Sequence, residues 1–381
     1  MVAHVEEAHA LLDEFEVGDE NNTVPVYPPA SCSIYGRQSL YWVKWPCSAR
    51  LIASLMTIVL CAFGAVFTLY GARTSPPVGG EMKHLGYFLN PQKHASRPPT
   101  TLVFNWTVTS GLRSPDGVQK QVYLVNEQFP GPIIEARSGD RIVVQVQNGL
   151  ADEDVSLHWH GLRLKHQNAM DGAVGFTQTA IQPLNTFIYN FTVGDDEYGT
   201  FWWHSHSDLQ RADGLWGGLV VHAPDEYPAE GDYLIMVGDW FHRNQTEVLS
   251  WYADASSRGN EPVPDSLLVN GRGRFNCSMA VPARPVACSQ VAIHGFEPLL
   301  KSVTGKSTKL RVVNTGSVAG FTVGVTGATV RPVRIDGGFD VRSESTQTAS
   351  ILYPGQRVDL DIEWDHSHLA TRQMVIYMDE E

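Results

Sequence analysis

The chain has 381 residues, which is enough for two domains of ordinary size with additional tails. Its 41 acidic side chains outnumber its 28 basic ones and give a net charge of −13, which argues against nucleic acid as a partner. A hydrophobic content of 43% with 34 glycines and 22 prolines favours a turn-rich all-β protein over a helical one.

The first 70 residues do not look like a folded domain. Residues 1–50 are acidic at first and then polar, without a sustained hydrophobic period, which is typical of a disordered tail. Residues 51–70 contain no charged side chain, and as a helix they would span about 30 Å, the thickness of a bilayer core. We therefore expect a transmembrane helix there. A cleaved signal peptide is the alternative, but fifty residues ahead of the apolar run are too many for one.

The flanking charges predict how a single-pass protein would be oriented. Slightly more basic residues precede the apolar run than follow it, which favours a cytoplasmic N-terminal tail and lumenal or extracellular C-terminal domains. N-glycosylation sequons on that side predict a glycoprotein, and they begin at Asn105, Asn190, Asn244 and Asn276. Asn21 begins another sequon on the opposite side.

Two cysteines beyond the apolar run are candidates for a disulfide. Cys277 and Cys288 lie eleven positions apart and could close a hairpin in an oxidising compartment. Spacing alone does not fix the geometry of such a pair, so a free thiol at each position stays an open alternative.

Strand patterns begin after a Pro- and Gly-containing stretch, residues 71–100, which we interpret as a stalk. Short β-branched runs bounded by Gly, Pro or Asp then predict strands at 102–108, 120–126, 141–148, 233–240, 309–314, 321–323, 329–337 and 357–362. No long amphipathic helix pattern interrupts them. We expect two all-β domains, residues 101–226 and 227–381, each a sandwich or barrel.

Two histidine doublets are the strongest chemical signal. His158 and His160 form one, and His204 and His206 form the other. Alternate side chains of a strand share a face, so two neighbouring strands would bring four imidazoles to one spot. Four imidazoles without a nearby cysteine favour copper or zinc. A single doublet of this kind is more often a surface or core pair, but two doublets in aromatic strands favour a metal site.

The segments around these doublets resemble a known family. His-Trp-His-Gly at 158–161, Met-Asp-Gly at 170–172, Gly-Thr-Phe-Trp-Trp-His-Ser-His at 199–206 and Asp-Gly-Leu-Trp-Gly at 213–217 resemble the first cupredoxin domain of multicopper oxidases, which include laccases, ferroxidases and ascorbate oxidases. Asp-Trp at 239–240, Asn-Gly-Arg-Gly at 270–273 and Pro-Gly-Gln-Arg at 354–357 resemble the second domain. The resemblance implies two tandem cupredoxin-like (plastocyanin-like) Greek-key β-sandwich or barrel domains.

The resemblance also implies a copper site. His158 would help to bind the type 2 copper, and the type 3 pair would be bound by His160, His204 and His206. Asp171 matches an acidic position thought to deliver protons to reduced oxygen, although an Asp-Gly pair can simply form a turn. Trp159 and Trp203 are expected to be core residues first of all, because of their aromatic bulk, and to shape and dry the site rather than carry electrons.

The chain departs from the family in two respects. One is Thr179, where many relatives have a cysteine whose disulfide tethers domains. The other is the third domain. The family's third domain carries a His-Cys-His segment that holds the type 1 copper, and no cysteine adjoins a histidine here. We therefore expect half of the trinuclear ligand set, in a truncated chain that is inactive alone or completed by a partner. Other histidine positions are expected not to be ligands, namely 166, 222, 366 and 368.

The expected function is that of a membrane-anchored, laccase-like oxidase that couples the oxidation of phenols to the reduction of dioxygen. The alternatives are a ferroxidase of iron uptake, which acts on ferrous iron, and a membrane-tethered copper-binding or interaction protein without catalysis.

Overall fold

The computed structural model describes residues 87–224, 226, 229, 231–282, 284–288, 308–364 and 373–378, all within a compact unit that begins at Glu81. The predicted tail, the predicted transmembrane helix at 51–70 and the doublet at 366–368 lie outside the described residues. Among the described helices, none combines the length and the apolar character needed to cross a bilayer.

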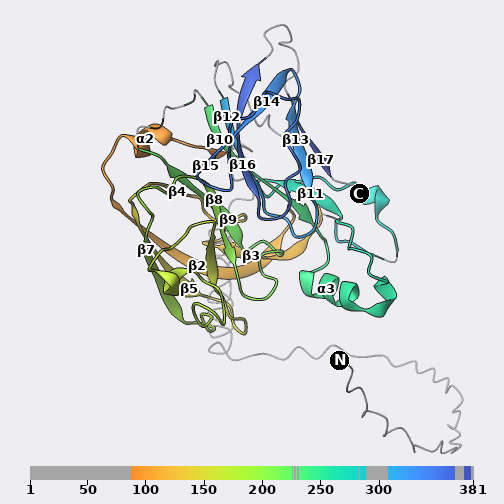
Figure 1. The fold of residues 1–381 in the computed structure, drawn as a ribbon. Helices are drawn as coiled ribbons and strands as arrows, with labels where there is room; N and C mark the ends of the chain where they lie inside the picture. Colours follow the sequence, from red (N-terminus) through yellow and green to blue (C-terminus); the bar gives the residue numbers. More distant parts are fainter. Residues whose placement is uncertain are drawn as a thin grey trace, which may run out of the picture. The chain divides into compact units, whose positions relative to one another are not determined.

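The first half of the described chain forms two facing four-stranded sheets, which we call the N-terminal sandwich (Figure 1). One sheet has the order β3-β2-β5-β7, made of Lys120–Val125, Thr101–Arg113, Arg141–Asn148 and Thr186–Thr192. The other has the order β4-β9-β8-β6, made of Ile134–Arg137, Trp216–His222, Gly199–Ser205 and Leu157–His160. Their inner faces enclose a core rich in Val, Ile, Leu and Trp.

The second half forms the C-terminal sandwich, which has its own core. Its larger sheet has the order β1-β10-β12-β16-β14-β15, with β11 also paired to β10. These strands are Tyr87–Phe88, Gly231–Trp240, Thr308–Asn314, Arg357–Trp364, Ala328–Ile335, Phe339–Asp340 and Ser266–Val269. The smaller sheet pairs β13 with β17, Phe321–Val325 with Met374–Met378. The described chain is therefore mostly β, as the sequence predicts.

Short helical elements were not expected from the sequence. They are α2 (Pro91–Ala95), α3 (Gln245–Ala253) and the 3₁₀ turns η1 (Asn168–Met170), η2 (Ala255–Ser257) and η3 (Cys277–Met279). Helix α3 buries only Gln245 and Val248, so it carries too little apolar periodicity to be recognised. The end of the predicted stalk is also structured, because β1 pairs with β10 and Leu89 is buried.

A separate apolar cluster joins the two sandwiches. Trp202 and Val220, from β8 and β9, pack with Leu234 and Met236 of β10 and with Val313 of β12. Along β8 the side chains alternate, so Phe201 and Trp203 enter the N-terminal core while Trp202 enters this cluster. Strand β8 is therefore buried on both faces, as its continuous apolar run requires.

Charged side chains are also buried between the sandwiches. The Arg311 guanidinium is fully buried and binds Asp232 at 2.7 Å, Glu226 at 3.1 Å and Asp359 at 3.2 Å. Asp359 in turn accepts a hydrogen bond from the Thr200 hydroxyl of β8. Such a cluster holds together only while its charges stay paired.

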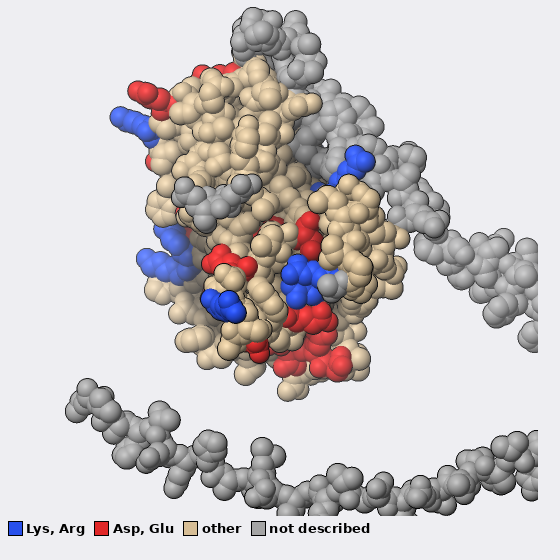
Figure 2. All heavy atoms as spheres, turned by 90° about the vertical axis from the view of Figure 1, so that its right-hand side faces the viewer, with Lys and Arg blue, Asp and Glu red and all other residues tan. Residues whose placement is uncertain are grey.

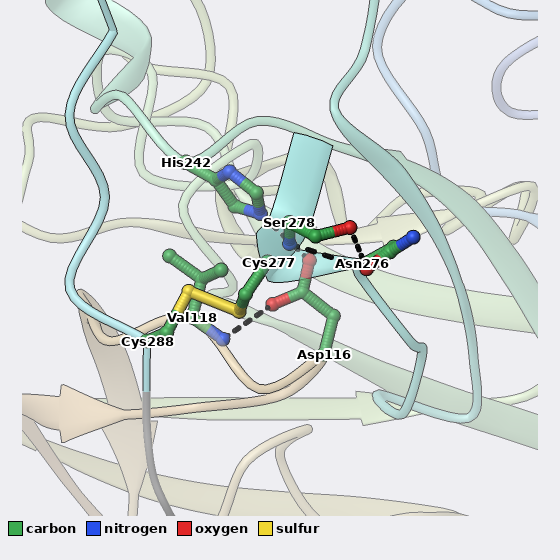
Figure 3. The surroundings of a disulfide bond; sticks show 7 residues. All are labelled: Asp116, Val118, His242, Asn276, Cys277, Ser278 and Cys288. Atoms are coloured by element: carbon green, nitrogen blue, oxygen red, sulfur yellow. Dashed lines mark hydrogen bonds and ion pairs between the residues drawn. A yellow bond between two sulfur atoms is a disulfide. The ribbon is translucent and has the colours of Figure 1, made fainter. Parts of the chain in front are cut away.

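Cys277 and Cys288 form a disulfide, which confirms the pairing that the sequence left open (Figure 3). The bonded loop also contacts the N-terminal sandwich, because the Gln119 amide donates to the Ala287 carbonyl at 2.8 Å. Asp116, beside this loop, accepts from the Val118 amide and pairs with His242 at 2.8 Å. The disulfide thus braces the junction of the two sandwiches.

Replacing Arg311 with Met should destabilise the fold strongly, because it leaves three carboxylates without their central cation. We expect a loss of about 3–5 kcal/mol in the free energy of unfolding. Arg331→Met is the matched control, since Arg331 is a half-exposed partner of Asp361 and such pairs contribute about 1 kcal/mol or less. Urea unfolding monitored by tryptophan fluorescence measures both, and equal losses would contradict the assignment.

Candidate metal centre

Strands β6 and β8 are paired antiparallel, and their register places His158 opposite His204. His160 lies two residues along β6 on the same face as His158, so three imidazoles leave the sheet together. His206 follows one residue after the end of β8. The 46-residue separation of the doublets is therefore closed by strand pairing, as the spacing predicted.

The four rings lie close together. The centroid of the His158 ring is 5.6 Å from that of His160, 5.4 Å from that of His204 and 5.0 Å from that of His206. One ring nitrogen each from His158, His160 and His204 lies within 4.8 Å of the others, a grouping that could hold a metal ion. The centroid of the His206 ring lies 5.0 Å from that of His158 and 5.5 Å from that of His204, but His206 contributes no nitrogen to that group.

Backbone carbonyls orient two of these rings. His158 Nδ1 lies 2.8 Å from the Asp171 carbonyl, and His204 Nδ1 lies 3.0 Å from the Ser205 carbonyl. A carbonyl only accepts, so Nδ1 carries the proton in both rings and Nε2 keeps its lone pair. His160 Nδ1 lies 3.2 Å from His204 Nε2, a separation suited to two nitrogens of one tetrahedral ion with bonds of about 2 Å.

Asp171 lies in a turn, and its carboxylate also lies beside the histidines. Its carboxylate Oδ1 is 3.3 Å from His158 Nδ1, and its side chain is 27% exposed, so it can reach solvent. The next residue, Gly172, has φ +83°, and a Cβ there would lie 1.9 Å from the Leu157 carbonyl oxygen. The Asp-Gly pair therefore forms a tight turn, and the turn brings the carboxylate to the histidines.

The tryptophan beside the imidazoles is Trp202, whereas the expectation named Trp159 and Trp203. The Trp202 ring centroid is 4.2 Å from that of His204 and 5.1 Å from that of His160. Trp159 and Trp203 are fully buried in the opposite core. The period-two alternation of β8 places Trp202 next to the imidazoles, because position 202 shares a face with position 204.

The C-terminal sandwich supports the site from the other side. A Cβ on Gly355 would lie 3.1 Å from His160 Cε1, so this turn lies directly against the imidazole. Arg357 donates through Nε to the Thr200 carbonyl at 3.2 Å and through Nη1 to Asp336 at 3.1 Å. The Pro-Gly-Gln-Arg segment carries no local sequence signal that it meets β8, because the contact of Arg357 with Thr200 spans 157 positions.

Burial favours the neutral form of three of the imidazoles, those of His160, His204 and His206. Desolvation, helped by the positive charge of Arg357, lowers the pKa of His160 to about 3. Desolvation also lowers the pKa of His204 well below its ordinary value and lowers that of His206. A metal needs the neutral imidazole, so these rings are ready ligands at neutral pH.

Other residues considered from the sequence lie outside the cluster. His222 ends β9 and is fully buried, where its Nδ1 lies 3.3 Å from Glu226. Both carboxylate oxygens of Asp239 accept hydrogen bonds from backbone amides of the loop at 317–319, so this side chain fixes that loop.

A cavity of about 940 Å³ beside α3 is lined by His242 and Trp251 but by none of the four histidines. The cavity and the imidazoles are therefore different sites.

Comparison with known proteins agrees with this geometry. The family model described as Multicopper oxidase matches residues 107–226, and a second model of the same description matches residues 231–368. The chain belongs to the multicopper oxidase family. The matched parts correspond to the family's N-terminal and middle cupredoxin domains, and membership implies copper.

Curated relatives and solved structures show how much of the family this chain covers. Laccase-1 of Cryptococcus neoformans var. grubii serotype A is 44% identical over 47% of this chain and 30% of that protein. L-ascorbate oxidase of Nicotiana tabacum is 34% identical over 66% of this chain and 44% of that protein. The structure of Fet3p, described as a multicopper oxidase that functions in iron import, aligns with a TM-score of 0.60 at 27% identity, over 74% of this chain and 49% of Fet3p. The chain thus spans less than half the length of these relatives.

The depressed pKa of His160 predicts an acid-sensitive fold when metal is removed. The unfolded histidine titrates near 6.5, so below that pH the unfolded chain binds a proton that the folded chain does not, down to about pH 3. The free energy of unfolding therefore falls as pH drops from about 6.5, at most by about 2 kcal/mol at pH 5 for this group.

Urea unfolding of chelator-treated protein at pH 7.5 and pH 5.0 measures this loss. We expect the His160→Gln protein to lose less free energy of unfolding between these two pH values than the unchanged protein loses. His166→Gln, at an exposed position, should lose as much as the unchanged protein. An identical loss in the His160→Gln protein would contradict the origin that we assign.

Proposed function

We propose that this chain provides the four-imidazole half of the trinuclear copper centre of a laccase-like oxidase, which couples one-electron oxidation of phenols to reduction of dioxygen. The observation that carries the proposal is the convergence of four imidazoles, from β6, from β8 and from the residue that follows β8, on one spot. In this assignment His158 contributes to the type 2 site. The type 3 pair is assigned to His160, His204 and His206.

The residues present fit copper. Imidazole nitrogen is a preferred ligand of copper, and the orientation of His158 and His204 by backbone carbonyls leaves Nε2 free. Bound copper would supply electrons to dioxygen. Trp202 and the Gly355 turn exclude water from one side of His160, which preserves its neutral form.

Asp171 is the residue that we assign to proton delivery. Its carboxylate contacts His158 and is part-exposed, so it can take a proton from solvent and hold it beside the centre. This role needs only the side-chain carboxylate, because the carbonyl of the same residue orients His158.

Phenols are the proposed substrates because a laccase, Laccase-1 of Cryptococcus neoformans var. grubii serotype A, is 44% identical to this chain over 188 residues. A ferroxidase is the second candidate, supported by the structural likeness to Fet3p. The remaining copper ligands are proposed to come from a further segment or a partner chain. We also propose that residues 51–70 anchor the chain in a membrane, with its domains on the lumenal or extracellular side.

Copper binding by the chain tests the ligand assignment. We expect the purified chain to retain copper after desalting, His204→Ala to lose most of it, and His166→Ala to retain it, because His166 lies outside the cluster. Copper retention equal in the His204→Ala protein and the unchanged chain, measured by elemental analysis, would contradict the assignment.

Oxygen consumption by the native material tests the reaction. Protein immunopurified from its own cells, with any partner attached, should show the blue absorption of a copper–thiolate bond and consume dioxygen faster with a phenol than with ferrous iron or ascorbate. Faster consumption with ferrous iron would favour the ferroxidase. Bound copper without any consumption would favour a copper-binding protein without catalysis.

A further inference from the structure

The outward face of the sheet β3-β2-β5-β7 carries apolar side chains that no described residue covers. Val103 of β2 is 63% exposed and Ile188 of β7 is 51% exposed. The inner face of the same strands buries Trp106, Val144 and Tyr189 in the N-terminal core. A sheet with one buried face ordinarily presents polar residues on the other. The exposed side chains of Val103 and Ile188 depart from that pattern.

Two N-glycosylation sequons stand on this same face. Asn105 begins Asn-Trp-Thr on β2, and Asn190 begins Asn-Phe-Thr on β7. The register pairs Asn105 with Gln145 of β5 and pairs Gln145 with Ile188, so these three share one row of the face. The neighbouring row contains Val103, Val143 and Asn190.

Each sequon asparagine therefore lies beside an exposed apolar residue. Val103 is two positions before Asn105, and Ile188 is two positions before Asn190, which puts each pair on one face about 6.7 Å apart along the strand. Across the strands, Asn105 is also in the row of Ile188, and Asn190 is in the row of Val103. The two asparagines therefore lie on one diagonal of this part of the face, and Val103 and Ile188 lie on the other.

The side chains of these asparagines are accessible for modification. Both residues are exposed, and among the described residues the Asn105 amide group has no hydrogen-bond partner. Asn190 Oδ1 accepts from Arg141 at 2.8 Å, and Nδ2 has no hydrogen-bond partner within the part of the chain that the structure describes. Two further sequon asparagines among the described residues cap helical turns: Asn244 binds Glu247 through Oδ1 and Nδ2, and Asn276 binds Ser278.

The disulfide points to the compartment in which this modification occurs. Cys277 is bonded to Cys288, and disulfides persist in secretory and extracellular environments. This observation is independent of the sequons. It agrees with domains that enter the secretory lumen during synthesis.

We propose that Asn105 and Asn190 each carry an N-linked oligosaccharide and that the two glycans cover the apolar residues of this sheet face. In each transfer a bond forms between Asn Nδ2 and C1 of the first sugar. The bond from C1 to the diphosphate of a polyprenyl-linked oligosaccharide breaks, the lipid diphosphate leaves, and the amide releases one proton. The covered face is then closed to protein partners, which must approach by other surfaces.

The test is expression of the full chain in a eukaryotic secretory system with site-by-site mapping of glycans. Enzymatic deglycosylation in ¹⁸O-water converts each occupied asparagine to a labelled aspartate, which peptide mass spectrometry locates. We expect label at Asn105 and Asn190. The variants Thr107→Val and Thr192→Val should each lose one glycan, while Thr107→Ser and Thr192→Ser, which preserve the sequons, should keep it.

A second measurement tests the covering role. The double variant Thr107→Val, Thr192→Val should aggregate more than the unchanged protein, and adding Val103→Thr with Ile188→Thr should reverse this increase. Absence of label at either Asn105 or Asn190, or label confined to Asn244 and Asn276, would overturn the proposal. Aggregation that does not change when both glycans are lost would overturn the covering role.

Discussion

The antiparallel pairing of β6 with β8 is the constraint on which the site depends. It sets His158 opposite His204 and leaves His160 on the same face, so one register decides whether the imidazoles meet. A slip of one residue would turn a whole strand's side chains to the opposite face. The register is protected because the alternate residues, Trp159 and Trp203, are fully buried in the core of the N-terminal sandwich.

The same alternation makes the site depend on both sandwiches. Thr200, Trp202 and His204 share the other face of β8, which meets the C-terminal sandwich at the Asp359 carboxylate and the shared apolar cluster. The Gly355 turn and Arg357 then enclose His160. Desolvation by these contacts is what depresses the imidazole pKa values. The chemistry of the histidines is thus a consequence of how the two sandwiches are joined. On the face shown in Figure 2, Asp and Glu side chains gather in the lower part, in keeping with the net charge of −13.

Local patterns predicted much of this structure. The β-branched runs correspond to β2, β3, β5, β10, β12 and β16, and period-two spacing predicted that the doublets would meet. The pairing of Cys277 with Cys288 and the turn that brings Asp171 to His158 needed coordinates, because each depends on local backbone geometry. Contacts over long separations gave no local signal, which is why Arg357 against Thr200 and the buried Arg311 cluster were not foreseen. Trp202 could have been foreseen from strand alternation alone.

X-ray absorption spectroscopy of the copper-loaded chain tests the central claim most directly, since it reports the atoms bound to the metal. The account predicts a shell of nitrogen ligands with the outer-shell scattering of imidazole rings, weakened in the His160→Gln and His204→Ala proteins and unchanged in His166→Gln. A shell of oxygen or sulfur ligands without imidazole scattering would contradict it.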